Sequence, residues 1–79
     1  MARIDFTIEP FVEGQPGAHV TEPIAVLASI GITAEFGAFG SSCDADEEDI
    51  PNVVAAVLKS AFAHGATRVN VDVVGDTTT

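Results

Sequence analysis

The sequence predicts a small α+β sandwich in which four strands and two helices follow the order β-α-β-β-α-β. Three observations lead to this prediction. Residues 3–9 and 68–73 alternate strictly between apolar and polar side chains, which is the period of a half-buried strand. Residues 50–62 carry one wide apolar stripe at helical spacing. A chain of 79 residues is long enough for one domain, so residues 1–79 are expected to form a single unit.

A turn is expected to separate the first strand from the first helix. Pro10 ends the strand at residues 3–9, because proline cannot donate to a sheet ladder. The first helix is expected to begin at Thr21, whose hydroxyl can cap it, with Pro23 in the first turn. Gly31 lies where a C-terminal cap is needed, so the helix is expected to end there.

Two short strands are predicted to form a hairpin in the middle of the chain. Residues 32–36 alternate, residues 37–40 contain two glycines that suit a bend, and residues 41–45 return antiparallel. Cys43 in the returning strand is interpreted as a small packing residue rather than a nucleophile.

The second helix has the strongest pattern in the chain. An acidic run at residues 46–49 precedes it, which is favourable against the helix dipole, and Pro51 fits its first turn. His64 and Gly65 are expected to end it, before the last strand. The order indicates a ferredoxin-like fold, with a four-stranded antiparallel sheet and both helices on one face. The opposite face is expected to carry the polar residues of the strands, namely Arg3, Asp5, Thr7, Glu9, Thr33, Glu35, Arg68, Asn70 and Asp72.

The charge of the chain limits its partners. The formal net charge is −9, with three basic residues, so a nucleic-acid backbone would be repelled. A small cation or a basic protein would be attracted. No apolar run is long enough to span a bilayer, and the N-terminus has no apolar signal core. These features predict a soluble, cytoplasmic protein without a membrane partner.

Self-association is expected to compensate for the low stability of a small hydrophobic core. A domain of this length buries only about 60% of the surface of its unfolded chain. The single cysteine excludes an internal disulfide, and no cysteine–histidine spacing fits zinc. We therefore expect a homo-oligomer, either a dimer or a tetramer.

Neither a metal site nor an active site is predicted. The acidic run does not place ligands and a glycine at the positions of a calcium loop, so it is interpreted as a solvated helix start. No nucleophile lies in a recognisable base–nucleophile arrangement, so no enzymatic activity and no cofactor are expected.

One segment resembles a known family. The run EFGAFGSSCDAD at residues 35–46 is similar to the pattern E-hydrophobic-G-P-x-G-T-x-x-E-G-(D/E) of the small thiamine-binding proteins. These are single-domain relatives of the YkoF-like hydroxymethylpyrimidine/thiamine-binding group. The segment HGATRV at residues 64–69 resembles the family's x-G-A-x-R-V, and the similarity covers roughly residues 4–76.

The resemblance implies a ligand, a fold and site residues. It implies a ferredoxin-like oligomer that binds thiamine or its hydroxymethylpyrimidine part without catalysis. On the matching positions, Ser41 and Asp44 would hydrogen-bond the pyrimidine, and Glu35 would add charge or a further contact. Phe36 or Phe39 would supply a ring wall, and Phe39 is preferred because strand alternation directs Phe36 toward the core. Glu9, on the polar sheet face, is a further candidate wall residue. The ligand is chemically consistent with the charge, because the thiazolium ring of thiamine is a fixed cation.

The sequence departs from the family pattern at several positions. Ala38 replaces the usual proline, Ser41 replaces threonine, and Asp44 replaces glutamate, which shortens the reach of the carboxylate. No arginine follows the last strand. Two other functions stay open from the residues alone: an oligomeric acidic protein-interaction or regulatory module without a small-molecule ligand, and a metal-binding module.

Overall fold

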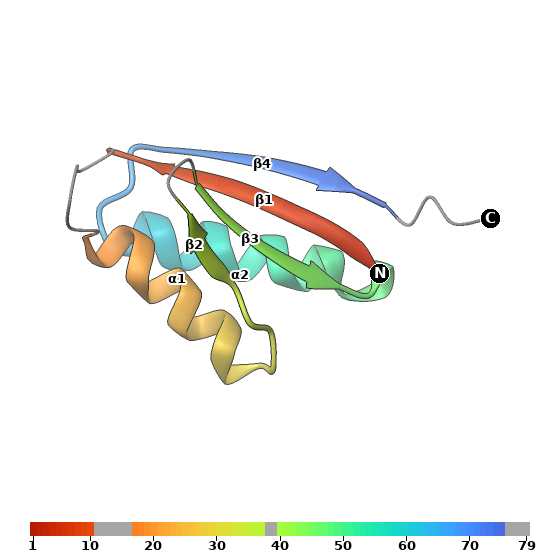
Figure 1. Cartoon of the computed structure of the whole chain (residues 1–79). Helices are drawn as coiled ribbons and strands as arrows, with labels where there is room; N and C mark the ends of the chain where they lie inside the picture. Colours follow the sequence, from red (N-terminus) through yellow and green to blue (C-terminus); the bar gives the residue numbers. More distant parts are fainter. Residues whose placement is uncertain (11–16, 38–39, 76–79) are drawn as a thin grey trace.

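The computed structural model describes residues 1–10, 17–37 and 40–75, and Figure 1 shows their arrangement. The elements confirm the predicted order. They are β1 (Ala2–Glu9), α1 (Ala18–Ser29), β2 (Glu35–Gly37), β3 (Gly40–Ala45), a short 3₁₀ turn η1 (Glu47–Asp49), α2 (Ile50–Ala63) and β4 (Arg68–Val74).

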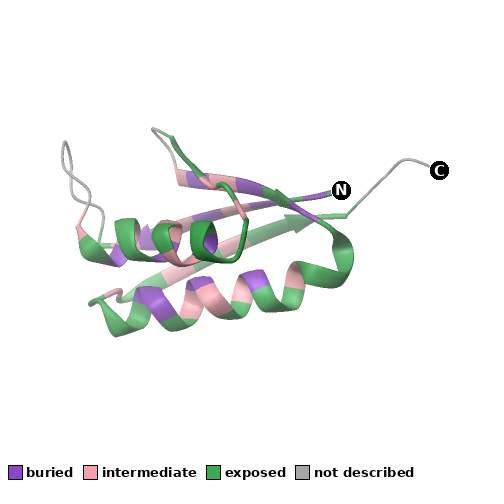
Figure 2. Ribbon diagram, turned by 90° about the horizontal axis from the view of Figure 1, so that it is seen from below, coloured by how far each residue is buried: buried purple, intermediate pink, exposed green. Residues whose placement is uncertain are grey.

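The four strands form one antiparallel sheet in the order β2-β3-β1-β4. The hairpin strand β3 lies between β2 and β1, and β4 pairs with the other side of β1. Seen from below, both helices lie on the same face of the sheet (Figure 2). The structure is therefore the predicted ferredoxin-like sandwich, and the face of the sheet away from the helices is open.

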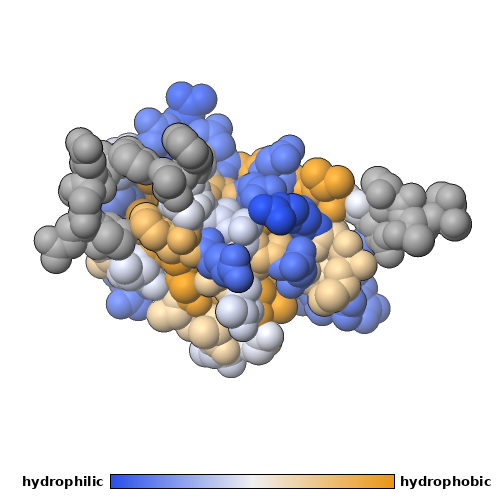
Figure 3. All heavy atoms as spheres, viewed as in Figure 1, coloured by the Kyte–Doolittle hydropathy of each residue, from blue (hydrophilic) through white to orange (hydrophobic). Residues whose placement is uncertain are grey.

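The core lies between the sheet and the helices. Ile4, Phe6 and Ile8 point from β1 toward the helices and are buried, as the alternation of β1 predicts. The apolar stripe of α2 packs against these side chains. Cys43 is buried among them, in agreement with its interpretation as a packing residue. The remaining buried apolar residues of this cluster are Leu27, Ala45, Val53, Val57 and Ala61. On the side seen in Figure 3, hydrophilic and hydrophobic side chains are interspersed.

Both helices end in the same way. The amides of Gly31 and Ile32 donate to the carbonyls of Ala28 and Leu27, at 3.1 and 2.9 Å. This is a Schellman motif, in which the residue after the cap takes a left-handed conformation. Gly31 has φ +84° and Gly65, at the end of α2, has φ +99°, so both predicted glycine stops are confirmed.

The start of α1 differs from the prediction. The helix begins at Ala18, so Pro23 lies inside it rather than in its first turn. The Thr21 hydroxyl does not cap the helix; it donates to the carbonyl of Gly17, at 3.4 Å. A long-range contact holds the first turn instead, because Nε2 of the buried His19 lies 2.6 Å from the carbonyl oxygen of Pro10, beyond the end of β1.

The strand β2 is shorter than predicted. It begins at Glu35 rather than at residue 32, so Thr33 is not part of the sheet. Ile32 and Ala34 leave the sheet ladder but still pack against the core. The alternation of residues 32–36 therefore reflects both packing against the core and a short edge strand.

Candidate functional site

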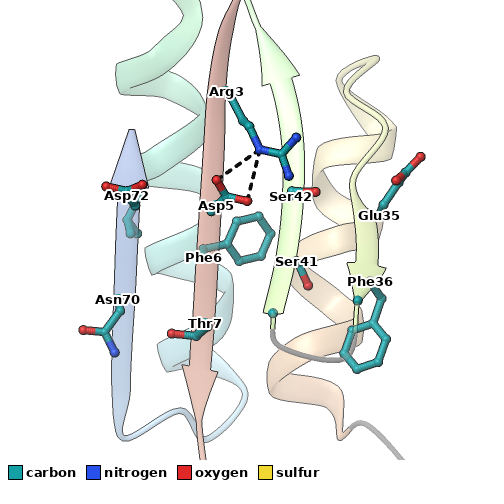
Figure 4. Close-up of a pocket in the computed structure, with 13 residues that line it drawn as sticks. Arg3, Asp5, Phe6, Thr7, Glu35, Phe36, Ser41, Ser42, Asn70 and Asp72 are labelled. Carbon is teal, nitrogen blue, oxygen red and sulfur yellow. Dashed lines mark hydrogen bonds and ion pairs between the residues drawn. The ribbon is translucent and has the colours of Figure 1, made fainter. Parts of the chain in front are cut away.

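The open face carries a row of polar side chains that crosses all four strands. Ser42 on β3 pairs with Glu35 on β2 and with Asp5 on β1, and Asp5 pairs with Asp72 on β4. We call Glu35, Ser42, Asp5 and Asp72 the carboxylate row. Figure 4 shows its members side by side on their strands. Neighbouring strands lie about 4.8 Å apart, so the row spans about 14 Å.

A hollow of about 460 Å³ lies over this part of the sheet, and we call it the sheet hollow. Its volume falls within the range of about 300–1,000 Å³ that is usual for small-molecule sites. All four strands contribute to its lining, which consists of Arg3, Asp5, Phe6, Thr7, Glu35, Phe36, Gly37, Gly40, Ser41, Ser42, Asn70, Val71 and Asp72.

Two paired glycines lie at one end of the sheet hollow, where they add no side chains. Gly37 pairs with Gly40 in the β2–β3 hairpin. A Cβ atom on Gly40 would lie 2.8 Å from Thr7 Cγ2 and 3.0 Å from the carbonyl oxygen of Phe6, and its φ of +142° disfavours other residues. The hairpin glycines therefore allow β3 to approach β1 closely at this point.

Arg3 lies over the carboxylate row but neutralises only part of it. Its Nε lies 3.2 Å from Asp5 Oδ2 and 3.4 Å from Oδ1 (Figure 4). The hydrogen bond and charge of Asp5 raise the pKa of the Arg3 guanidinium, with smaller effects from Asp44 and Glu35. Among the described residues, Glu35 and Asp72 take part in no ion pair. The sheet hollow thus has an excess of negative charge.

The structure places on opposite faces of the sheet two residues, Ser41 and Asp44, that the family resemblance expects to bind the same pyrimidine ring. Asp44 is exposed and lies opposite Arg3 on the open face, next to the sheet hollow. Ser41 lies opposite Phe6 and is only 4% exposed. Residues three apart in a strand face opposite sides of the sheet, so Ser41 and Asp44 diverge. Ser41 still contributes to the lining of the sheet hollow, and no described residue hydrogen-bonds its hydroxyl.

The other candidate residues are placed as follows. Glu35 lines the sheet hollow as a member of the carboxylate row. Glu9 lies on the open face beyond the end of the sheet hollow, where its Oε2 is 3.7 Å from Nε of Arg68. Phe39 lies outside the described residues.

The acidic segment after β3 is exposed, as expected for a solvated helix start. Glu47, Glu48 and Asp49 form η1, and all three are exposed. Within residues 1–10, 17–37 and 40–75, no group of three or more histidine, cysteine or acidic side chains could hold a metal ion. None of the described helices is long and apolar enough to cross a membrane.

Sequence reasoning missed Ser42 and did not single out Asp5 and Asp72. The alternation of β3 contains the signal for Ser42, because a buried Cys43 requires Ser42 and Asp44 to share the open face. The alignment of Ser42 with Glu35 and Asp5 depends on the register between strands, which one sequence does not reveal.

The fold and the open face define a ferredoxin-like α+β domain, and solved structures share this architecture. A domain of unknown function, DUF77, from Bacillus cereus superimposes with a TM-score of 0.64 at 19% identity, over 92% of this chain and 71% of the other. Protein SP2199 from Streptococcus pneumoniae superimposes with a TM-score of 0.69 at 22% identity, over 96% of this chain and 88% of the other. These likenesses establish the fold. No family model and no curated protein matches the chain.

Proposed function

We propose that this domain binds thiamine, or its hydroxymethylpyrimidine moiety, in the sheet hollow, without catalysis and as a self-associated chain. The carboxylate row is the observation that carries the proposal. It sets three carboxylates and a hydroxyl along a hollow of about 460 Å³. The resemblance of residues 35–46 to the small thiamine-binding proteins supplies the ligand class.

The chemistry of the row suits a flat cation with polar edges. Carboxylates accept hydrogen bonds from an exocyclic amine, and the Ser42 hydroxyl both donates and accepts, so together they can satisfy an aminopyrimidine. The excess negative charge attracts a thiazolium ring. Since Arg3 pairs with Asp5, the carboxylate of Glu35 is the strongest candidate for the ligand.

The lining can hold a ligand by charge and hydrogen bonds. On the open face, its side chains supply carboxylates, hydroxyls, an amide and a guanidinium. We propose that the carboxylates recognise the ligand as fixed charges and hydrogen-bond acceptors.

Isothermal titration calorimetry with thiamine and with isolated hydroxymethylpyrimidine tests the proposal. We expect saturable heat with thiamine, and weaker binding to the Glu35→Gln variant. Glu48→Gln is the matched control, because it removes the same charge from the exposed turn η1. Equally weakened thiamine binding in both variants would mean that the net charge of the protein, and not Glu35 itself, attracts the ligand. Heat of dilution only, with both ligands, would overturn the proposal and favour an acidic protein-interaction module.

A further inference from the structure

The two edges of the sheet differ in length and protection. The β2 edge has three residues, and a short edge offers little for another strand to pair with. The β4 edge runs for seven residues, Arg68–Val74, and contains no proline, glycine or lysine. Natural edge strands use proline and charged side chains to prevent pairing with another chain, and the charged residues of β4 are Arg68 and Asp72, of opposite sign. Among the described residues, no further strand pairs with the outer side of β4.

The end of β4 also exposes apolar surface. Val73 is 40% exposed and Val74 is 47% exposed. Alternating valines at 69, 71 and 73 give β4 a high strand propensity. An exposed strand of this composition is a template for pairing with another strand.

The charges on β4 are incompletely matched within one chain. Asp72 lies directly opposite Asp5, and like charges in this position destabilise a sheet. Arg3 neutralises Asp5, whereas Asp72 has no ion pair among the described residues. Arg68 contacts Glu9 only at 3.7 Å, and its side chain is 70% exposed, so it can reach a second carboxylate.

We propose that β4 pairs antiparallel with β4 of a second copy of this chain, about a two-fold axis at Asn70. Arg68 of each chain then lies opposite the partner's Asp72, on the open face. Val69 lies opposite the partner's Val71, on the helix side. The pairing joins two sheets edge to edge and supplies a counterion to Asp72, the member of the carboxylate row on β4.

The charges select this register. Both copies keep their helices on the same side of the joined sheet only if each residue pairs with one that faces the same side. The two-fold axis must therefore pass through a residue and not between two residues. An axis at Asp72 would place this aspartate opposite its own copy. An axis at Val71 would place Arg68 opposite the partner's Val74 and leave its charge unmatched. Opposite charges at directly paired positions stabilise a sheet, so the axis at Asn70 is favoured.

This inference specifies the self-association that is part of the proposed function and rests on that part, whereas ligand binding can hold or fail without it. Sedimentation velocity of the full chain without ligand, over a range of concentrations, tests it. The variants are Arg68→Asp and Asp72→Arg, each alone, mixed in equal amounts, and combined in one chain. Circular dichroism verifies that each variant is folded.

We expect the unmodified chain to dimerise. Each single variant places two like-charge pairs at the interface and should raise the dissociation constant at least about tenfold at low salt. In the equimolar mixture every pair is again of opposite charge, so a dimer containing one chain of each variant should form, and the combined variant should dimerise by itself.

Three results would overturn the inference. The first is an unmodified chain that stays monomeric at the highest soluble concentration. The second is a dimer that neither single variant weakens, because two copies would then meet at another surface. The third is failure of the mixture to associate when both single variants are folded.

Discussion

Asp5 and Asp72 lie directly opposite each other on β1 and β4, and Arg3 neutralises only Asp5. The sheet therefore contains a like-charge pair that is half compensated. Such a pair costs the folded chain stability, and a cationic group placed beside Asp72 would recover it.

The Asp72→Asn variant should change stability and binding in opposite directions. Without ligand, removing the repulsion should raise the free energy of unfolding by about 0.5 kcal/mol. Thiamine binding should weaken about three- to tenfold, because one carboxylate is lost. Urea unfolding at one dilute protein concentration and calorimetry measure the two effects. A variant that is stabilised but binds thiamine with unchanged affinity would remove Asp72 from the site.

The Arg3→Gln variant should bind thiamine about three- to tenfold more tightly than the unmodified chain. The loss of Arg3 frees Asp5 to interact with the ligand. Lys59→Gln is the matched control, since it removes the same charge from an exposed position on α2, on the other side of the sheet. If both variants tighten binding equally in calorimetry, net charge alone explains the result.

Gly40→Ala should destabilise the fold more than Gly31→Ala. Both residues have positive φ, but only at Gly40 would the added Cβ meet other atoms, 2.8 Å from Thr7 Cγ2 and 3.0 Å from Phe6 O. We expect each variant to lose about 1 kcal/mol from backbone strain, and Gly40→Ala to lose about a further 1 kcal/mol or more from crowding. Urea denaturation measures both losses. Equal losses would indicate that the hairpin can move away from β1.

Stability should decline at alkaline pH because of Cys43. Burial raises the pKa of its thiol above the ordinary value of 9.0, with smaller effects from Asp44 and Asp5. The folded chain then holds the thiol proton more tightly than the unfolded chain does. This contribution is complete below the pKa of the unfolded thiol and is lost as the pH rises through the pKa of the folded thiol.

Urea unfolding between about pH 7.5 and 10.5 tests this behaviour. The chain contains no tyrosine and one lysine, so few other groups titrate in that range. The Cys43→Ala variant should lack the part of the decline due to the thiol. Parallel pH profiles for the two proteins would show that the decline has another source.

Local patterns predicted most of the fold. Alternation identified β1 and β4, helical spacing identified α2, and the left-handed glycines Gly31 and Gly65 ended both helices as expected. The predicted start of α1 was wrong. The contact that holds the first turn, between His19 and the carbonyl of Pro10, joins residues nine apart in the sequence, so no local pattern reveals it.

The site was less accessible to sequence reasoning. The motif identified Glu35 and Ser41, which both line the sheet hollow, but not the neighbours that cross-strand pairing brings to them. Asp5 and Ser42 meet because β3 inserts between β1 and β2. Their alignment depends on strand register, and so does the position of Asp72.

The place of β4 in the chain has a consequence for synthesis on the ribosome. Of the four strands, β1 is made first, yet it is flanked by β3 and β4, and β4 is made last of the four. Domains fold as units, so this one cannot complete its sheet until β4 has been made. The same strand carries the edge that we propose for self-association. A nascent chain therefore lacks the pairing edge until β4 has been made, so the proposed self-association cannot begin before that point.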